Sequence, residues 1–204
     1  MLVVIAVLSL VGVLILTIFT RTLRGSNKAQ IIGVIKQNGQ SVLESMTSNI
    51  RNADNLICPV DSTPTNTLVV VKNGIYLRYR IAFAGNSKVP SSCSANGCIV
   101  SDNPVQSTDP TADEVANPTL FVNRVCNPLS IIPDPLSSAL IMTDTNTQSG
   151  VSVSNKSGLF VRSKASGFKD GVTINFSLEE AKDALPSVAG QIDPVTFETT
   201  IQLR

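Results

Sequence analysis

The residues with the most definite chemistry in this chain are its four cysteines, Cys58, Cys93, Cys98 and Cys126. An even number of thiols in a domain that follows an apolar segment favours disulfide bonds in an oxidising compartment. The Cys-x4-Cys spacing of the middle pair fits none of the usual CxxC patterns of zinc or redox sites. We therefore expect structural bridges rather than a catalytic thiol.

Four cysteines allow three pairings, and loop geometry favours one of them. If residues 94–97 form a four-residue hairpin loop, Cys93 and Cys98 lie opposite each other within bonding distance. A two-residue Asn96-Gly97 turn would misalign the two cysteines. The Cys58–Cys126 bond then follows by exclusion, and it would tie the end of a long predicted helix to the middle of a predicted sheet.

Other catalytic or metal-binding patterns are weak. The chain has no histidine, which excludes a Ser-His-Asp triad, a Cys-His pair and a His-ligated metal. One Ser-x-x-Lys pattern, Ser166 to Lys169, lacks the partner motifs of the hydrolases that use it, and G-x-S-x-G is absent. We expect no enzymatic activity, no cofactor and no metal.

One polar loop carries a group of acidic residues that could bind calcium: Asp102, Asp109, Asp113 and Glu114. Their spacing does not match an EF-hand, and a solvated acidic loop is the simpler interpretation.

The element that dominates the chain is an uncharged run at residues 1–19, MLVVIAVLSLVGVLILTIF. It is about as long as a helix needs to be to cross a bilayer, and it is apolar on every side. A secretory signal peptide would place basic residues before a shorter apolar core and a small-residue cleavage site after it. A simple signal anchor and an uncleaved signal are the alternative interpretations.

The charge pattern around this run carries a conflict. Arg21, Arg24 and Lys28 follow the run, so the positive-inside rule taken alone would leave the large domain in the cytoplasm. The cysteines and the Ser-, Thr- and Asn-rich composition indicate an exported domain. A basic leader before the run would remove the conflict. The formal net charge of +1 offers no basic field for nucleic acid.

Residues 22 to about 57 are predicted to continue as an amphipathic helix. Apolar residues recur every three to four positions: Ile32, Ile35, Val42 or Leu43, Met46 and Ile50. Gly25, Gly33 and Gly39 weaken the helix by about 1 kcal/mol each, and Gly25 is the expected place for a bend. Cys58-Pro59 marks the expected end, because a residue before proline avoids the helical region.

The remainder of the chain is predicted to be β-rich. Residues 67–83 read as a hairpin with an Asn73-Gly74 turn, in which Leu68 and Val70 share a face with Tyr79 while Arg78 and Arg80 point to the opposite, wet face. Two later strands show strict alternation: Val172–Leu178 and Phe197–Leu203. Three candidates are less regular: Thr119–Cys126, Ala139–Thr143 and Gly158–Ser163. The long helix is expected to cover the buried face.

These patterns predict an α+β fold in which a long N-terminal helix, with a membrane half and an amphipathic half, packs on an antiparallel β-sheet globular domain. We expect three parts: residues 1–20 as the transmembrane half of the helix, 21–57 as its amphipathic half, and 58–204 as an extracytoplasmic β-rich domain.

The order of these parts resembles the type IV pilins and the pseudopilins of type II secretion. MLVVIAVLSLVG is similar to the segment that follows the Phe-Thr-Leu-Ile-Glu signature of that family, which is absent here. The resemblance places the signature directly before Met1, after a short basic leader. ESMTSNIRNADNL at residues 44–56 resembles the end of the long helix in the larger minor pilins, and TFETTIQLR at residues 196–204 resembles their closing strand.

The resemblance implies a structural subunit, a minor pilin or pseudopilin, that is inserted in the membrane and assembled through its N-terminal helix. The residues that would pack in the filament are Val4, Ile5, Val7, Leu8, Val11, Leu14, Ile15 and Ile18. The implied partners are other pilin or pseudopilin subunits, an inner-membrane assembly platform, and the lipid bilayer before assembly. A signal-anchored extracellular binding domain unrelated to pili is the alternative.

Overall fold

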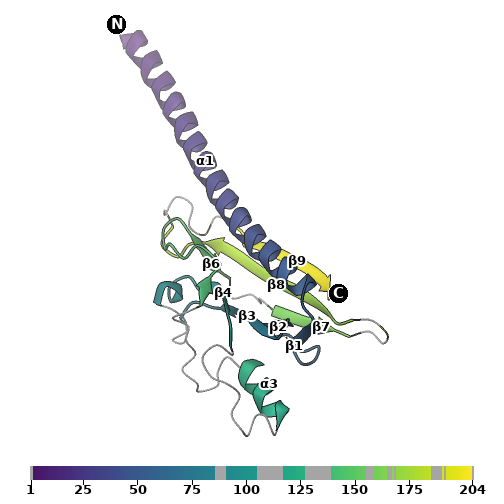
Figure 1. Ribbon diagram of the computed structural model, residues 1–204. Helices are drawn as coiled ribbons and strands as arrows, with labels where there is room; N and C mark the ends of the chain where they lie inside the picture. The colour runs from purple at the N-terminus through teal and green to yellow at the C-terminus, as the bar shows by residue number, and fades with distance from the viewer. Residues whose placement is uncertain are drawn as a thin grey trace.

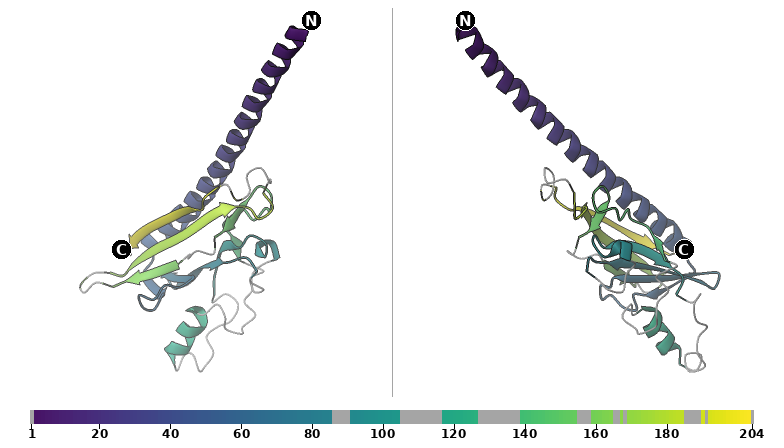
Figure 2. Two further views of the ribbon diagram at one scale, coloured as in Figure 1. Left: turned by 180° about the vertical axis from the view of Figure 1, so that it is seen from behind. Right: turned by 90° about the vertical axis from the view of Figure 1, so that its left-hand side faces the viewer.

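The computed structural model describes residues 2–85, 91–104, 117–126, 139–154, 159–164, 167, 169–184, 190 and 192–203. Helix α1 spans Leu2–Arg51 without interruption, so the apolar run and the amphipathic segment form one helix, as predicted. Figures 1 and 2 show α1 without a sharp kink. Its N-terminal half extends away from all of the strands, and its C-terminal half lies against them.

The helix ends earlier than the sequence pattern predicts. The expected helical stretch up to residue 57 is wrong in its last part, where Asn55–Cys58 form strand β1. The backbone N–H of Asp54 donates to the carbonyl of Val71 over 2.8 Å, and β1 pairs antiparallel with β2, Thr67–Lys72. Pairing with a neighbouring strand satisfies the backbone and buries Leu56, so the tertiary contact decides the boundary.

The first sheet has the strand order β1-β2-β3-β4-β5, with β3 at Ile75–Ala82, β4 at Cys98–Asp102 and β5 at Leu140–Ile141. The β2–β3 hairpin has the predicted register, in which Leu68 lies opposite Tyr79. Asn73 and Gly74 have φ values of 51° and 76°, which a type I′ turn requires. The short-range turn signal was therefore sufficient to fix this hairpin.

The second sheet is built around β8, Gly171–Glu180. Strand β9, Val195–Gln202, pairs along one edge of β8, while β6, Val151–Val153, and β7, Leu159–Ser163, pair with its other edge. The predicted alternation is confirmed here. Apolar residues of β8 are buried, and hydroxyl pairs on the outer face, such as Thr173 with Thr200 at 2.9 Å, lie toward solvent.

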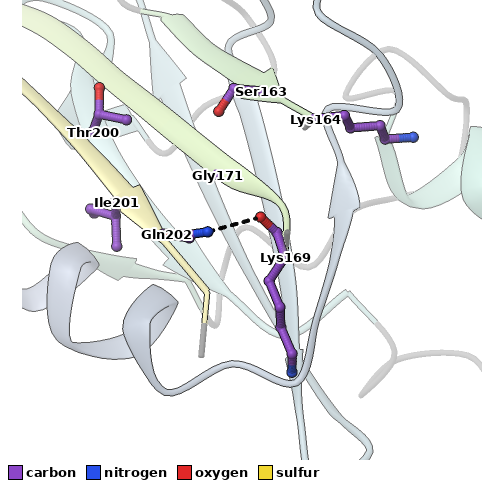
Figure 3. Close-up of a pocket in the computed structure, with 7 residues that line it drawn as sticks. All are labelled: Ser163, Lys164, Lys169, Gly171, Thr200, Ile201 and Gln202. Carbon is purple, nitrogen blue, oxygen red and sulfur yellow. Dashed lines mark hydrogen bonds between the residues drawn. The ribbon is translucent and has the colours of Figure 1, made fainter. Parts of the chain in front are cut away.

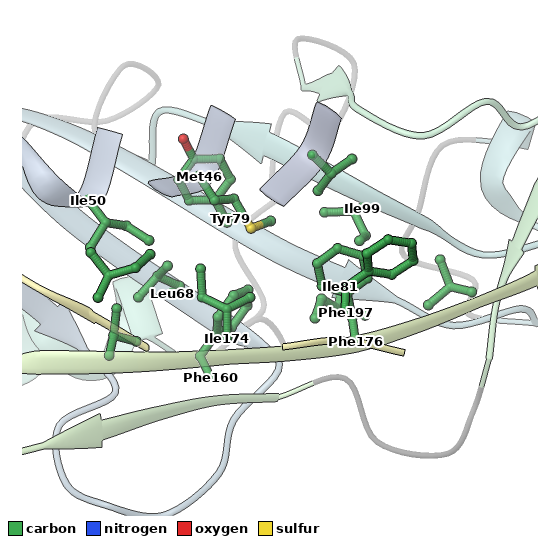
Figure 4. Close-up of a cluster of buried hydrophobic side chains, with 14 of the residues drawn as sticks. Met46, Ile50, Leu68, Tyr79, Ile81, Ile99, Phe160, Ile174, Phe176 and Phe197 are labelled. Carbon is green, nitrogen blue, oxygen red and sulfur yellow. The ribbon is translucent and has the colours of Figure 1, made fainter. Parts of the chain in front are cut away.

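Helix α1 and both sheets share one hydrophobic core. Figure 4 shows Met46 and Ile50 of α1 beside side chains from β2, β3, β4, β7, β8 and β9. The buried residues of α1 are those with the predicted three-to-four spacing: Ile35, Val42, Met46 and Ile50. Asn49 adds a polar contact, donating from Nδ2 to the Tyr79 hydroxyl over 2.6 Å. Burial raises the pKa of the Tyr79 phenol, so this hydroxyl stays neutral in the core.

Gly39 has a packing role that its low helix propensity does not suggest. A Cβ at this position would lie 2.1 Å from the Phe197 Cζ atom, far inside contact distance. The Phe197 ring is itself stacked on Phe176, with centroids 5.3 Å apart, so it has little room to move. The absence of a side chain at Gly39 therefore lets β9 approach α1 closely.

Gly39→Ala is expected to destabilise the domain, although alanine is the better helix former. The gain in propensity is about 1 kcal/mol, whereas overpacking costs about 1–3 kcal/mol, so the net loss is on the order of 1 kcal/mol. Gly33→Ala is the matched control, because a Cβ there meets nothing within 4 Å and should stabilise. Thermal unfolding of the detergent-solubilised chain measures both; equal shifts for the two variants would contradict the packing role.

The outer face of the first sheet is covered, which the alternation did not predict. Residues 119–126, expected as a strand, belong to helix α3, Pro118–Cys126. Pro118 occupies the first helical position, and the Asn117 carboxamide oxygen accepts the N–H of Thr119 over 3.3 Å, so the segment carries a helix start signal. Helix α3 packs Val125 against Val69, a residue on the face opposite Leu68.

The structure also corrects the expectation that Arg78 and Arg80 are exposed to water. Both are buried, and both bind the carboxylate of Asp102, which lies in β4 and not in a loop. Arg78 lies directly opposite Asp102 in the β3–β4 ladder, and its Nε donates to Oδ1 over 2.9 Å. Arg80 Nη2 lies 2.7 Å from Oδ2. The alternation correctly predicted which residues share this face, but the expectation that the face is exposed to solvent was wrong.

Candidate functional site

The N-terminal half of α1 carries most of the exposed large apolar side chains in the described chain. The large side chains that the structure describes in this half are exposed: Val4, Val7, Leu8, Leu10, Val11, Val13, Leu14, Ile15, Leu16, Ile18 and Phe19. A soluble protein seldom leaves so continuous an apolar surface uncovered, and large patches of this kind mark sites of membrane or protein contact. The candidate site is therefore this helix half, residues 2–20.

The helix satisfies the length and composition required to span a membrane. Residues 2–20 rise about 28 Å at 1.5 Å per residue, close to the hydrocarbon thickness of a typical bilayer of about 30 Å. Arg21 is the first charged residue of the chain and follows directly. The described part of the chain thus has one helix that is long and apolar enough to cross a bilayer. Its first charged side chain lies where the hydrocarbon core of the bilayer would end.

The hydroxyl side chains near the end of this half are satisfied within the helix itself. Thr17 donates to the carbonyl of Val13 over 2.8 Å, and Thr22 donates to that of Ile18 over 2.9 Å. Thr20 donates to the carbonyl of Leu16 over 3.0 Å. A polar group in hydrocarbon is costly unless it has a partner, so these internal bonds make the threonines compatible with lipid or with a packed helix core.

The eight residues expected to pack in an assembly all lie on this helix half. At 3.6 residues per turn, all of them except Ile5 fall in one stripe about 120° wide, and Ile5 lies about 60° beyond its edge. Seven of them, Val4, Val7, Leu8, Val11, Leu14, Ile15 and Ile18, have exposed side chains; the side chain of Ile5 lies outside the described part. The structure places them as one stripe, and exposed apolar residues such as Leu10, Val13 and Leu16 occupy the other sides of the helix.

The four cysteines form the predicted pairs. Cys58 is bonded to Cys126 and Cys93 to Cys98, with Cα–Cα distances of 5.6 and 5.3 Å. The local structures differ from those expected. Cys93 ends the 3-10 helix η1, Ser91–Cys93, and its carbonyl accepts the Gly97 N–H over 2.8 Å, so residues 94–97 are a helical turn and not a hairpin loop.

The longer bridge also joins different elements from those expected. It connects β1 at the edge of the first sheet to the C-terminal end of α3, and not the end of the long helix to the middle of the sheet. This bond therefore fastens α3, which covers the outer face, to the sheet that it covers.

Removing the two bridges separately is expected to have unequal effects. The loop closed by Cys58–Cys126 has a sequence separation of 68, against 5 for Cys93–Cys98. On the chain-entropy account, loss of the first costs about 4 kcal/mol and loss of the second about 2 kcal/mol. Denaturant unfolding of the two double-serine variants measures the difference. A larger loss from the Cys93–Cys98 variant, or four free thiols in native exported protein, would contradict this expectation.

Asn96 is a structural residue that the sequence pattern did not identify. It is fully buried beside Cys98, and its Nδ2 donates to the carbonyl of Asn146 over 3.2 Å. Its Oδ1 accepts the N–H of Lys182 over 3.0 Å, and its own carbonyl accepts the N–H of Val153 over 2.8 Å. The small disulfide loop is therefore a connector between the two sheets. An Asn-Gly dipeptide normally indicates only a turn, so no sequence signal distinguished this role.

The acidic group considered for calcium does not form one site in the described chain. Asp102 is engaged by Arg78 and Arg80, while Asp109, Asp113 and Glu114 lie outside the described residues. Within the described part, no three acidic or sulfur side chains gather closely enough to hold a metal ion.

A surface hollow of about 260 Å³ lies at the end of the second sheet (Figure 3). Seven residues line it: Ser163, Lys164, Lys169, Gly171, Thr200, Ile201 and Gln202. Gln202 Nε2 donates to the backbone carbonyl of Lys169 over 3.5 Å, and the ammonium groups of the two lysines point in different directions. These seven residues do not form a nucleophile–base pair. Ser166 of the Ser-x-x-Lys pattern lies outside the described residues.

No family of known proteins, no curated protein sequence and no solved structure matches this chain.

Proposed function

We propose that this chain is a structural subunit of a type IV pilus or type II secretion-like filament, in the role of a minor pilin or pseudopilin. The observation that carries the proposal is the continuity of α1. At one end of this helix the described large apolar side chains are exposed, and at the other end the helix is packed into the core of a disulfide-bonded β domain.

This continuity suits a subunit that exists in two environments. Before assembly, the apolar half is soluble in a bilayer as a single-pass anchor, with the β domain on the extracytoplasmic side. After extraction, the same surface can be buried only against other apolar helices, and copies of this chain or of related subunits supply them. The disulfides support an exported location for the domain, because such bonds persist in oxidising compartments.

The proposed partners follow from these two states. They are the lipid bilayer before assembly and other pilin or pseudopilin subunits in the filament. A third partner is an inner-membrane assembly platform that moves the subunit from the bilayer into the filament. The product is a filament in the periplasm or at the cell surface. No catalytic step is assigned to the chain.

A site-specific photo-crosslinker tests the proposal. Leu14 in α1 and Val60 in the globular domain have nearly equal exposures of 55% and 54%. A crosslinking amino acid at residue 14 is expected to capture another subunit in filaments sheared from cells, whereas the same group at residue 60 provides the matched control. Capture of lipid alone from position 14, with no filament fraction, would favour a signal-anchored binding domain instead.

A further inference from the structure

Three basic residues follow the apolar half of α1 on one side of the helix. At 3.6 residues per turn, Arg21, Arg24 and Lys28 fall within an arc of about 60°. All three are exposed, and α1 carries no acidic residue before Glu44. No hydrogen bond or ion pair joins Arg21 or Arg24 to another described residue.

The basic face lies on the same side of α1 as the β domain. The same helical repeat places Gly39 and Met46, which pack against the β domain, within about 20° of Arg21. The basic face therefore lies on the side of α1 to which the domain is attached, between the domain and the apolar half. Figure 2 shows the domain on one side of α1 only.

The depth of the three residues matches a headgroup layer. Arg24 and Lys28 lie about 5 and 10 Å beyond Arg21 along the axis, at 1.5 Å per residue. The polar layer on each side of the hydrocarbon core is roughly 5–8 Å thick, and long basic side chains reach back toward it. If residues 2–20 span the core, the guanidinium groups lie at the level of the lipid phosphates.

We propose that Arg21, Arg24 and Lys28 form a docking surface for anionic phospholipid headgroups in the leaflet next to the β domain. The inference rests on the proposed membrane insertion of α1, and it adds a lipid preference to it. Charge complementarity identifies the occupant, and the surface is continuous with the helix half that enters the bilayer. Extraction of the subunit then has to break these contacts, so its membrane affinity depends on salt.

The test uses the full chain in mild detergent, transferred into vesicles of phosphatidylcholine alone or of phosphatidylcholine with phosphatidylglycerol. The fraction that floats with each vesicle type is measured at low and high salt. Each basic side chain near an anionic surface contributes about a fivefold factor in affinity, so we expect wild type to favour the anionic vesicles by at least about tenfold. High salt should reduce this preference.

Variants separate the basic face from net charge. The triple variant Arg21→Gln, Arg24→Gln and Lys28→Gln should lose the preference while still inserting into both vesicle types. A control that removes three exposed cations elsewhere, Arg51→Gln, Lys72→Gln and Lys164→Gln, has the same net charge and should keep the preference. The charge-preserving variant Arg21→Lys with Arg24→Lys should also keep it.

Each outcome has a definite meaning. Equal insertion of wild type into both vesicle types would overturn the lipid preference and leave the proposed anchor intact. Equal loss of preference in the triple variant and in the net-charge control would overturn the assignment to these three residues. Failure of wild type to insert into either vesicle type would overturn the lipid inference and the proposed function together.

Discussion

Val11→Asp is expected to abolish incorporation of the subunit into filaments while leaving the β domain folded. Val11 lies near the middle of the apolar half, with 44% of its surface exposed, and the described domain does not cover it. A carboxylate at the centre of a bilayer costs roughly 2.5–3.5 kcal/mol on insertion scales. In a packed helix core the same carboxylate would be buried without a partner, which costs as much or more.

Val60→Asp is the matched control, because Val60 is 54% exposed and lies on the globular domain. Both variants are expressed in cells that lack the wild-type chain, and sheared filaments or secretion are assayed together with protease resistance of the domain. Normal assembly of Val11→Asp, with full activity of the soluble domain alone, would make the helix only a tether. The signal-anchored binding domain would then be the better interpretation.

Asp102→Ala is expected to cause the largest loss of stability among the polar residues described. The side chains of Arg78, Arg80 and Asp102 are at most 8% exposed, and both guanidinium groups bind the Asp102 carboxylate. Removing one partner of a buried ion pair leaves charge uncompensated and costs about 3–5 kcal/mol. The expected result is a large fall in the free energy of unfolding, measured by denaturant titration.

A double-mutant cycle distinguishes the ion pairs from other effects of the substitution. In a background with Arg78→Met and Arg80→Met, the same Asp102→Ala change should cost much less, because the two cations that this carboxylate binds are then absent. Asp193→Ala, at an exposed position, is the surface control and should be nearly neutral. An equal cost of Asp102→Ala in both backgrounds would show that the carboxylate stabilises the domain in some other way.

Much of the fold was predictable because local signals are strong in this chain. The uncharged run continuing into a three-to-four repeat predicted one helix, and α1 is one helix. Asn73-Gly74 predicted the turn, register and face of the β2–β3 hairpin. Strict alternation in residues 172–178 and 197–203 predicted β8 and β9. In each case the pattern and the local geometry require the same conformation.

The errors occurred where distant segments decide local structure. Residues 55–57 were predicted as helix but belong to a strand that pairs with β2. Residues 119–126 carry β-branched and aromatic residues but form α3 over the outer face of the first sheet. Arg78 and Arg80 are buried, although alternation alone marks their face as wet. A period of two shows which residues share a face, but only tertiary packing determines whether the face meets water.

The candidate site follows from local residue types alone, because a helix that is apolar on every side for about the thickness of a bilayer needs no distant residue to define it. The pairing of the cysteines was predicted correctly, although from a hairpin loop at residues 94–97 where the structure has a helical turn. The tertiary structure was needed to show which elements the disulfide bonds connect. It also shows that a side chain at Gly39 would collide with Phe197, and that Asn96 joins the two sheets. These features depend on contacts between segments far apart in the chain, and no local pattern of residue types records which segments will meet.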